Sequence, residues 1–146
     1  MENQEIVKQE ESAVTASTFS NVFTTCDLED RRGKNAILRA LNDAESLAQA
    51  VKPGDVLEVV DFAVTPGIRR SRQANVPDAE CCNVYILTKD GRAFMTQSDG
   101  IARSVQQIVA LYPNGFRDLE DGCIKLTVRS RELMSGNTVK SLVPVD

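Results

Sequence analysis

The stretch that decides the fold is Asn83-Val-Tyr-Ile-Leu-Thr-Lys-Asp-Gly-Arg-Ala-Phe-Met-Thr-Gln97, in which two runs of strand-forming residues flank Asp90-Gly91. An Asp-Gly pair in this setting favours a tight type I′ hairpin turn, which needs positive φ at both central residues. We therefore expect an antiparallel hairpin. Successive side chains of a strand point to opposite faces, so Ile86 and Met95 are expected to face a core, and Arg92 and Phe94 to face outward.

A helix and a second hairpin follow. After the N-capping pair Ser98-Asp99, apolar residues recur at helical spacing through residues 101–112. Residues 124–129 and 138–143 then alternate as two strands, with a turn near Ser135. A helix between the third and fourth strands of a small β domain is the order of an OB-fold. We expect a mainly β fold: an OB-fold-like five-stranded barrel with a helix between strands 3 and 4, preceded by an N-terminal strand and helix.

The first half of the chain supplies that N-terminal strand and helix. Residues 1–13 are polar and acidic without periodicity, which predicts a flexible acidic arm. Residues 14–25 are rich in Thr, Val and Phe and predict a strand, and residues 34–51 carry an apolar stripe at helical spacing. Residues 55–64 predict a strong strand. We expect residues 14–146 to form a single OB-like domain.

The strand at 55–64 and the connection that follows it each carry a feature that affects the predicted barrel. In the strand at 55–64, Glu58 interrupts the apolar face that contains Phe62, which predicts a bulge or a solvated end and places Phe62 in the core. Residues 66–80 then form a long connection that carries three arginines, and its length predicts a functional or mobile loop, or a hairpin extended beyond the barrel. Guanidinium groups at this density can pair with phosphates or stack on bases; a solvated loop and a subunit contact remain the alternatives.

Charge and hydropathy narrow the class of protein. The chain of 146 residues has a formal net charge of −4. The first 12 residues carry −3, from four glutamates (Glu2, Glu5, Glu10, Glu11) against Lys8, so the remainder carries −1. This balance argues against a strong non-specific binder of duplex DNA and leaves room for a local basic face. No apolar run is long enough for a membrane span and the N-terminus does not resemble a signal peptide, so we expect no membrane partner and a cytoplasmic location.

Residues for catalysis or metal binding are sparse. The chain has no histidine, and its four cysteines (Cys26, Cys81, Cys82, Cys123) show no C-x-x-C spacing. No phosphate loop, dinucleotide fingerprint or nucleophile elbow is present. We therefore predict no catalytic residue, no metal site and no cofactor, and reduced thiols in or near the core. The alternative is a thiol-dependent enzyme using Cys81 or Cys82, in which the base would have to be a lysine or a carboxylate.

The predicted outward face of the barrel is the candidate binding surface. Cations that follow a backbone, together with rings on which bases stack, suit single-stranded nucleic acid. Aromatic residues make up only 5% of the chain, so any stacking platform is sparse. With the arginines of the 66–80 loop, the candidate nucleic-acid-binding residues are Arg69, Arg70, Arg72, Tyr85, Arg92, Phe94, Lys125, Arg129, Arg131 and Lys140.

Several segments also carry a family resemblance. They are Ala36-Ile-Leu-Arg-Ala-Leu-Asn, Gly54-Asp-Val-Leu-Glu-Val-Val-Asp, Leu87-Thr-Lys-Asp-Gly-Arg-Ala-Phe, Ser98-Asp-Gly-Ile-Ala-Arg-Ser-Val-Gln-Gln-Ile-Val and Ile124-Lys-Leu-Thr-Val-Arg. By element order and hydrophobic pattern over residues 20–143, the chain resembles the small single-stranded-DNA-binding proteins of tailed bacteriophages. It departs from that family in the long arginine-bearing loop at 66–80.

The resemblance implies an OB-like fold and a non-enzymatic role in phage DNA replication. In that role the protein would coat displaced single strands cooperatively and without sequence preference, in the host cell cytoplasm. Single-stranded DNA is the expected partner, with RNA as an alternative ligand. Self-association along the strand and recruitment of a replication protein by the acidic arm stay open. The alternative function is a protein-interaction or structural module on the same barrel, using the 34–51 segment or the arm and binding no nucleic acid.

Overall fold

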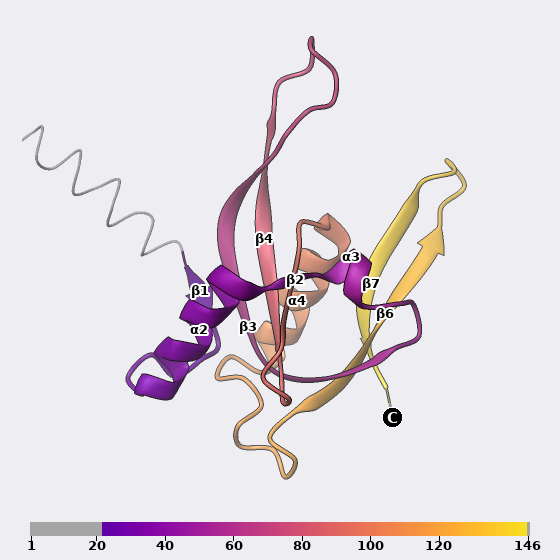
Figure 1. The fold of residues 1–146 in the computed structure, drawn as a ribbon. Coiled ribbons are helices and arrows are strands. Elements are labelled where there is room, and N and C mark those ends of the chain that lie inside the picture. The colour runs from indigo at the N-terminus through magenta and orange to yellow at the C-terminus, as the bar shows by residue number, and fades with distance from the viewer. Residues whose placement is uncertain (1–21, 146) are drawn as a thin grey trace, which may run out of the picture.

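The computed structural model describes residues 22–145, where a strongly curled sheet is accompanied by helices (Figure 1). The predicted acidic arm at 1–13, and most of the predicted strand at 14–25, lie outside the described residues. The elements in chain order are β1 (Phe23–Thr24), α2 (Arg31–Asp43), β2 (Glu45–Ser46), α3 (Leu47–Ala50), β3 (Val56–Arg69), β4 (Ala79–Thr88), β5 (Ala93–Thr96), α4 (Asp99–Leu111), β6 (Ile124–Glu132) and β7 (Thr138–Pro144). None of the helices in this part of the chain is long and apolar enough to cross a membrane.

The described strands form one sheet in the order β2-β5-β4-β3-β6-β7, and β1 pairs with β3 off this path. The prediction of a mainly β fold is confirmed. The sheet is a curled half-barrel of seven strands, and no pairing joins β5 to β7 within residues 22–145. The predicted helix after the first tight hairpin is α4, which lies between β5 and β6 in the chain.

Two long hairpins extend beyond the curled part of the sheet and rise on the same side of the molecule (Figure 1). In the β3–β4 hairpin, pairing continues out to Arg69 opposite Ala79, so only residues 70–78 connect the strands. Within the predicted long loop at 66–80, residues 66–69 and 79–80 belong to the paired strands and residues 70–78 connect them, which is the extended-hairpin form that its length allowed. The β6–β7 hairpin pairs out to Glu132 opposite Thr138.

A bulge in β3 changes which of its residues face the core. The β3–β4 register shifts between Val59 and Asp61, as the polar interruption at Glu58 predicts. Before the shift Leu57 and Val59 are buried, and after it Phe62 is fully buried, which confirms the core assignment of Phe62. Simple alternation from Phe62 would place Val56 on the same apolar face, but Val56 is 49% exposed because the bulge reverses the alternation.

Apolar side chains pack on both faces of β4. On one face Val84 and Ile86 join the main core, which α4 completes with Ile101 and Val105. On the other face Tyr85 packs with a smaller cluster that includes residues of α2. Ser98 caps α4 by accepting a hydrogen bond from the Ile101 N–H, at 3.2 Å.

The helix predicted over residues 34–51 is shorter than expected and begins earlier. It ends at Asp43, because the next residues form β2, which pairs in parallel with Phe94 and Met95 of β5. At its start, Asp30 caps the helix by accepting from the Arg32 N–H at 3.0 Å. Helical spacing in the sequence continues across the break, so periodicity alone does not mark it.

The turn between β4 and β5 differs from the predicted one, and the difference reverses the faces of β5. Leu87 pairs with Ala93 and Ile86 with Phe94, a register that leaves three residues beyond the Thr88–Arg92 contact rather than two. Gly91 has φ 86°, whereas no non-glycine residue of the described chain has positive φ, which excludes a type I′ turn at Asp90-Gly91. A shift of one residue moves every side chain of a strand to the other face. Phe94 therefore faces the main core beside Ile86, and Met95 packs against the smaller cluster on the other face.

Candidate nucleic-acid interface

A cleft of about 320 Å³ lies between α4 and the β6–β7 hairpin and is lined by four cations. These are Arg103 of α4, Arg129 and Arg131 of β6, and Lys140 of β7. No Asp or Glu lines this cleft, and none of the four takes part in the ion pairs found within residues 22–145. We call these four residues the basic cleft. Unpaired cations on a concave surface are suited to an anionic backbone.

The packing of α4 against β7 holds Arg103 in this cleft. A side chain at Gly100 would overlap the carbonyl oxygen of Lys140, so the helix touches the strand backbone there. One turn later, the Ser104 Oγ accepts a hydrogen bond from the Leu142 N–H at 3.0 Å. Arg103 is exposed between these two contacts. Arg103 is not among the residues predicted from the sequence, which come from strands and from the 66–80 loop; its position off the apolar stripe of α4 was the available signal.

The faces of β7 also differ from the prediction. Val128 pairs with Leu142 and Ser130 with Lys140, so Leu142 is buried and Lys140 lies on the same strand face as Leu142. Lys140 was expected to share a face with Arg129 and Arg131, and that expectation is wrong. It nevertheless lines the basic cleft, because the core ends before this part of the hairpin and leaves Lys140 exposed.

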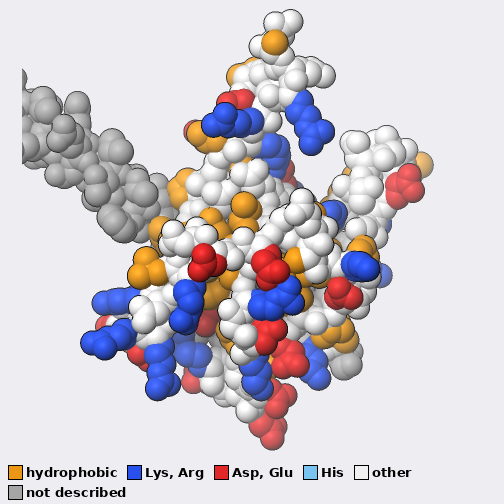
Figure 2. Space-filling model, in the orientation of Figure 1, with side chains coloured by type: hydrophobic (Ala, Val, Ile, Leu, Met, Phe, Trp, Pro, Cys, Tyr) orange, Lys and Arg blue, Asp and Glu red, His pale blue; other side chains and the backbone are white. Residues whose placement is uncertain are grey.

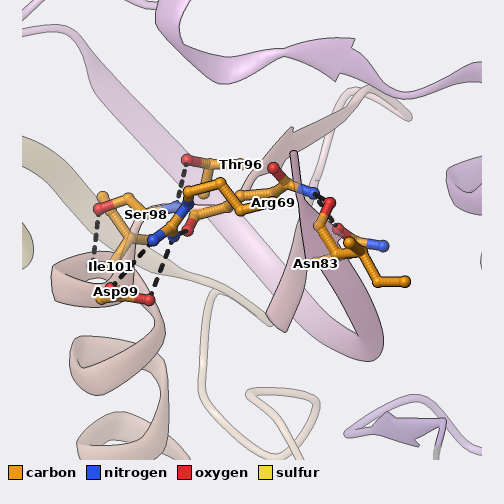
Figure 3. Close-up of polar contacts among 8 residues, drawn as sticks. Arg69, Asn83, Thr96, Ser98, Asp99 and Ile101 are labelled. Carbon is orange, nitrogen blue, oxygen red and sulfur yellow. Dashed lines mark hydrogen bonds and ion pairs between the residues drawn. The ribbon is translucent and has the colours of Figure 1, made fainter. Parts of the chain in front are cut away.

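Arg69 braces the β3–β4 hairpin against α4 (Figure 3). Its guanidinium forms an ion pair with Asp99, at 3.2 Å, and donates to the Gln97 carbonyl. The Gln97 amide in turn donates to the Asn83 side chain at 2.9 Å. Arg70 and Arg72 lie farther out, in the exposed turn of the hairpin, and make no ion pair with described residues. The three arginines that the sequence groups together therefore differ in surroundings.

We expect Arg69→Ala to loosen this brace while leaving the fold intact. The pair is exposed, so its loss should lower the free energy of unfolding by no more than about 1 kcal/mol. Amide hydrogen exchange at the outer rungs of the hairpin and at the first turn of α4 should nevertheless become faster. Arg72→Ala is the matched control, since Arg72 has no described ion-pair partner. Equal exchange in both variants would contradict the bracing role.

The predicted stacking rings are not accessible. Phe94 is 1% exposed in the main core and Tyr85 is 8% exposed beneath α2, so neither can offer a face to a base. The expectation that they face outward is wrong, for Phe94 because of the register of β5. Arg92 does face outward, but it donates to both carboxylate oxygens of Glu45 at 2.9 Å. This hydrogen bonding lowers the pKa of Glu45 and ties β5 to the neighbouring strand β2.

Lys125 stands apart from the basic cleft. It is exposed at the start of β6, opposite Glu58 of β3 in the sheet register, and does not line the cleft. Figure 2 shows cationic side chains on both hairpins and over α2, with acidic side chains among them across the visible face. Of the predicted residues, the structure brings together Arg129, Arg131 and Lys140.

The cysteines show no arrangement typical of a catalytic site. Cys26 and Cys123 are buried and Cys81 is half-buried, as expected, but Cys82 is exposed, contrary to the prediction of thiols in or near the core. Burial raises the pKa of the Cys26 thiol to about 11, which keeps it protonated and unreactive at neutral pH. Within residues 22–145, no group of three or more His, Cys, Asp or Glu side chains is placed to hold a metal ion.

Asp61 is a half-buried carboxylate that ties three segments together. It accepts from the Thr25 hydroxyl at 2.8 Å, and Arg117 lies 3.9 Å away while donating to the Thr25 carbonyl. Burial raises the pKa of Asp61 above its ordinary value of 3.8, an effect that outweighs the opposing hydrogen bond from Thr25 and the charge of Arg117.

The raised pKa predicts a pH dependence of stability. The folded state binds the Asp61 proton more tightly than the unfolded state, so its contribution is fully present at low pH and declines as pH rises from the unfolded pKa through the folded one. Asp61→Asn can still accept from Thr25 and should remove this decline. Urea unfolding of the wild-type protein and of Asp61→Asn across this pH range gives the difference between their free energies of unfolding, which measures the decline. A difference that is constant with pH would contradict the prediction.

Comparison with known proteins agrees with this geometry. The model of the phi29-type family, described as phage single-stranded DNA-binding protein, matches residues 16–142. No curated protein and no solved structure gives a significant match. Because the family match covers most of the chain, the protein belongs to the phi29-type phage single-stranded DNA-binding protein family and is a single-stranded-DNA-binding protein.

Proposed function

We propose that this protein coats single-stranded DNA during phage DNA replication in the host cytoplasm, without catalysing a reaction, and that the basic cleft holds the phosphate backbone. The observation that carries the proposal is that α4, β6 and β7 bring together four cations, none of them ion-paired within residues 22–145, in a chain of net charge −4. Local cations of this kind give affinity for phosphates without reading sequence.

The fold supports the same proposal. We propose that β3 to β7 are the five strands of an open OB-type barrel, in which α4 takes the place between the third and fourth strands. The pairing of β3 with β4 and β6, of β4 with β5, and of β6 with β7 suits that assignment. OB-type barrels bind single strands through a groove across the sheet and its loops.

A salt titration tests the function. Fluorescence anisotropy of labelled oligo-dT should report binding whose affinity falls as salt rises, with a log–log slope of about −0.7 for each single-strand phosphate contacted. Four cations at the cleft then predict a slope of roughly −3. Oligo-U in parallel decides between DNA and RNA. Absence of binding at tens of micromolar protein and low salt would count against this function.

One observation favours a second role alongside the first. Leu38 and Leu41 lie on the same side of α2 and are 57% and 39% exposed, while Ile37 and Ala40 make the buried side of that helix. Exposed apolar residues beside cations such as Lys34 suit contact with another protein. We propose that a replication protein or a second copy of the chain contacts the protein here. If one tagged copy of the wild-type chain pulls down a second copy and the Leu38→Ser variant does not, the result would support self-association.

A further inference from the structure

The described part of the chain offers one exposed aromatic ring. Binding of single strands usually adds stacking of bases on rings to the attraction between cations and phosphates. Four of the six described rings are buried, and Tyr112 is half-buried with its ring centroid 5.1 Å from that of Phe116. Phe23 is 45% exposed. If a ring among residues 22–145 is to stack on a base, Phe23 is the one placed to do so.

Phe23 lines a groove of about 500 Å³ beside α4. The other walls are mainly apolar and come from Val64 of β3, Cys82 of β4 and one side of α4, which contributes Ala102, Val105 and Val109. Pairing of β1 with β3, in which Phe23 lies opposite Val64, fixes the backbone that carries the ring. The neighbouring Thr24 hydroxyl donates to the Phe62 carbonyl at 2.8 Å and adds to this anchoring. The ring is thus held at the mouth of an apolar groove.

The groove and the basic cleft share one lining residue. Arg103 lines both of them, with the groove on the β1–β3–β4 side of α4 and the cleft on its β6–β7 side. Asp99 is the one acidic residue of the groove lining, and the ion pair with Arg69 offsets its charge. A single strand of DNA whose phosphates follow the basic cleft therefore reaches Arg103, and the apolar groove begins beside that residue.

We propose that this groove is a nucleobase subsite, in which a base of the bound single strand stacks on Phe23 while an adjacent phosphate contacts Arg103. The proposal rests on the proposed function, since the cleft brings the strand to the groove. Polar side chains in the lining are few, namely Asp99, Arg103 and Gln106 among the nine residues, so the subsite reads little of the base edge. Because every base has a π face, such a site accepts any base.

Comparison of a normal strand with one that lacks bases tests the subsite. Phe23→Ala should weaken binding of oligo-dT by about 5- to 150-fold, the fold-change that corresponds to one stacked base. It should leave binding of an abasic oligomer of equal length unchanged, and Phe23→Tyr should restore binding of oligo-dT. Leu28→Ala is the control, since Leu28 is 47% exposed and lies outside the groove lining. Thermal unfolding checks that each variant is folded.

The outcomes separate the two proposals. If wild-type protein binds neither oligomer, the proposed function fails. If wild-type protein binds oligo-dT and Phe23→Ala binds it equally well, the function stands and the nucleobase subsite is overturned; a groove that holds a protein segment instead gives this result.

A second measurement does not depend on truncating the ring. The chain has no tryptophan, so Phe23→Trp places a single tryptophan, which can be excited selectively over the two tyrosines, at the mouth of the groove. Stacking should quench this fluorescence on addition of oligo-dT but not on addition of the abasic oligomer. Leu111→Trp is the control, because Leu111 is 78% exposed at the end of α4 and outside the groove. Equal quenching at both positions, or none at Phe23→Trp while oligo-dT is bound, would overturn the subsite.

Discussion

Arg103→Gln, Arg129→Gln and Arg131→Gln, combined in one variant, should reduce the affinity for oligo-dT about 100-fold at 0.1 M salt. Each lost phosphate contact removes about 0.7 from the log–log salt slope, so three contacts remove roughly 2 units, which is two orders of magnitude relative to 1 M salt. Anisotropy titrations at a series of salt concentrations measure both quantities. Because glutamine keeps most of the side chain and all three arginines are exposed, the fold should persist.

A variant with the same change of charge elsewhere isolates the cleft. Arg31→Gln, Arg32→Gln and Arg39→Gln remove three exposed cations from α2, which packs on the face of β4 that carries Tyr85 rather than against α4. If position matters, this control should keep nearly the full salt slope. Equal losses in the two triple variants would mean that net charge, and not the basic cleft, governs binding.

Phe94→Ala should lower the free energy of unfolding by about 3–5 kcal/mol, the usual cost of truncating a buried phenylalanine. The ring is 1% exposed in the main core, so its removal leaves a cavity beside Ile86. Urea denaturation measures the loss. Met95→Ala, at the next position of β5 and only half-buried, should cost clearly less.

The same variant decides between two roles for Phe94. The sequence suggested a stacking platform, for which alanine would weaken DNA binding by about 1–3 kcal/mol and leave stability alone. The structure predicts the reverse: reduced stability and, in the fraction that remains folded, an unchanged salt slope. A Phe94→Ala protein that is fully stable but binds oligo-dT more weakly would show that Phe94 contacts DNA.

The elements were largely predictable from the sequence, and the strand faces were not. The apolar stripe of α4, the buried Phe62 and the bulge after Glu58 follow from local patterns. The faces of β5 depend on whether the Asp90-Gly91 turn closes with two residues or three. The two turn types differ little in energy, yet the three-residue turn places Phe94 in the main core where the two-residue turn would place Met95.

The candidate site was predictable only in part, because ion pairs join residues far apart in the chain. Arg129 and Arg131 are recognisable as outward cations of a strand. Nothing local shows that Glu45, 47 residues away, holds Arg92, or that Asp99 holds Arg69. Likewise Arg103 joins Arg129 only because Gly100 lets α4 lie against β7.

That contact of α4 with β7 also bears on how the protein behaves when crowded. A free outer strand invites edge-to-edge addition of another sheet, the usual start of aggregation. On β7 the Leu142 N–H is already bonded to Ser104, and Gly100 covers the carbonyl of Lys140. At the opposite edge of the sheet β2 is only two residues long. At the two ends of this strand order, crowded molecules therefore find little free strand edge through which to merge into a continuous sheet.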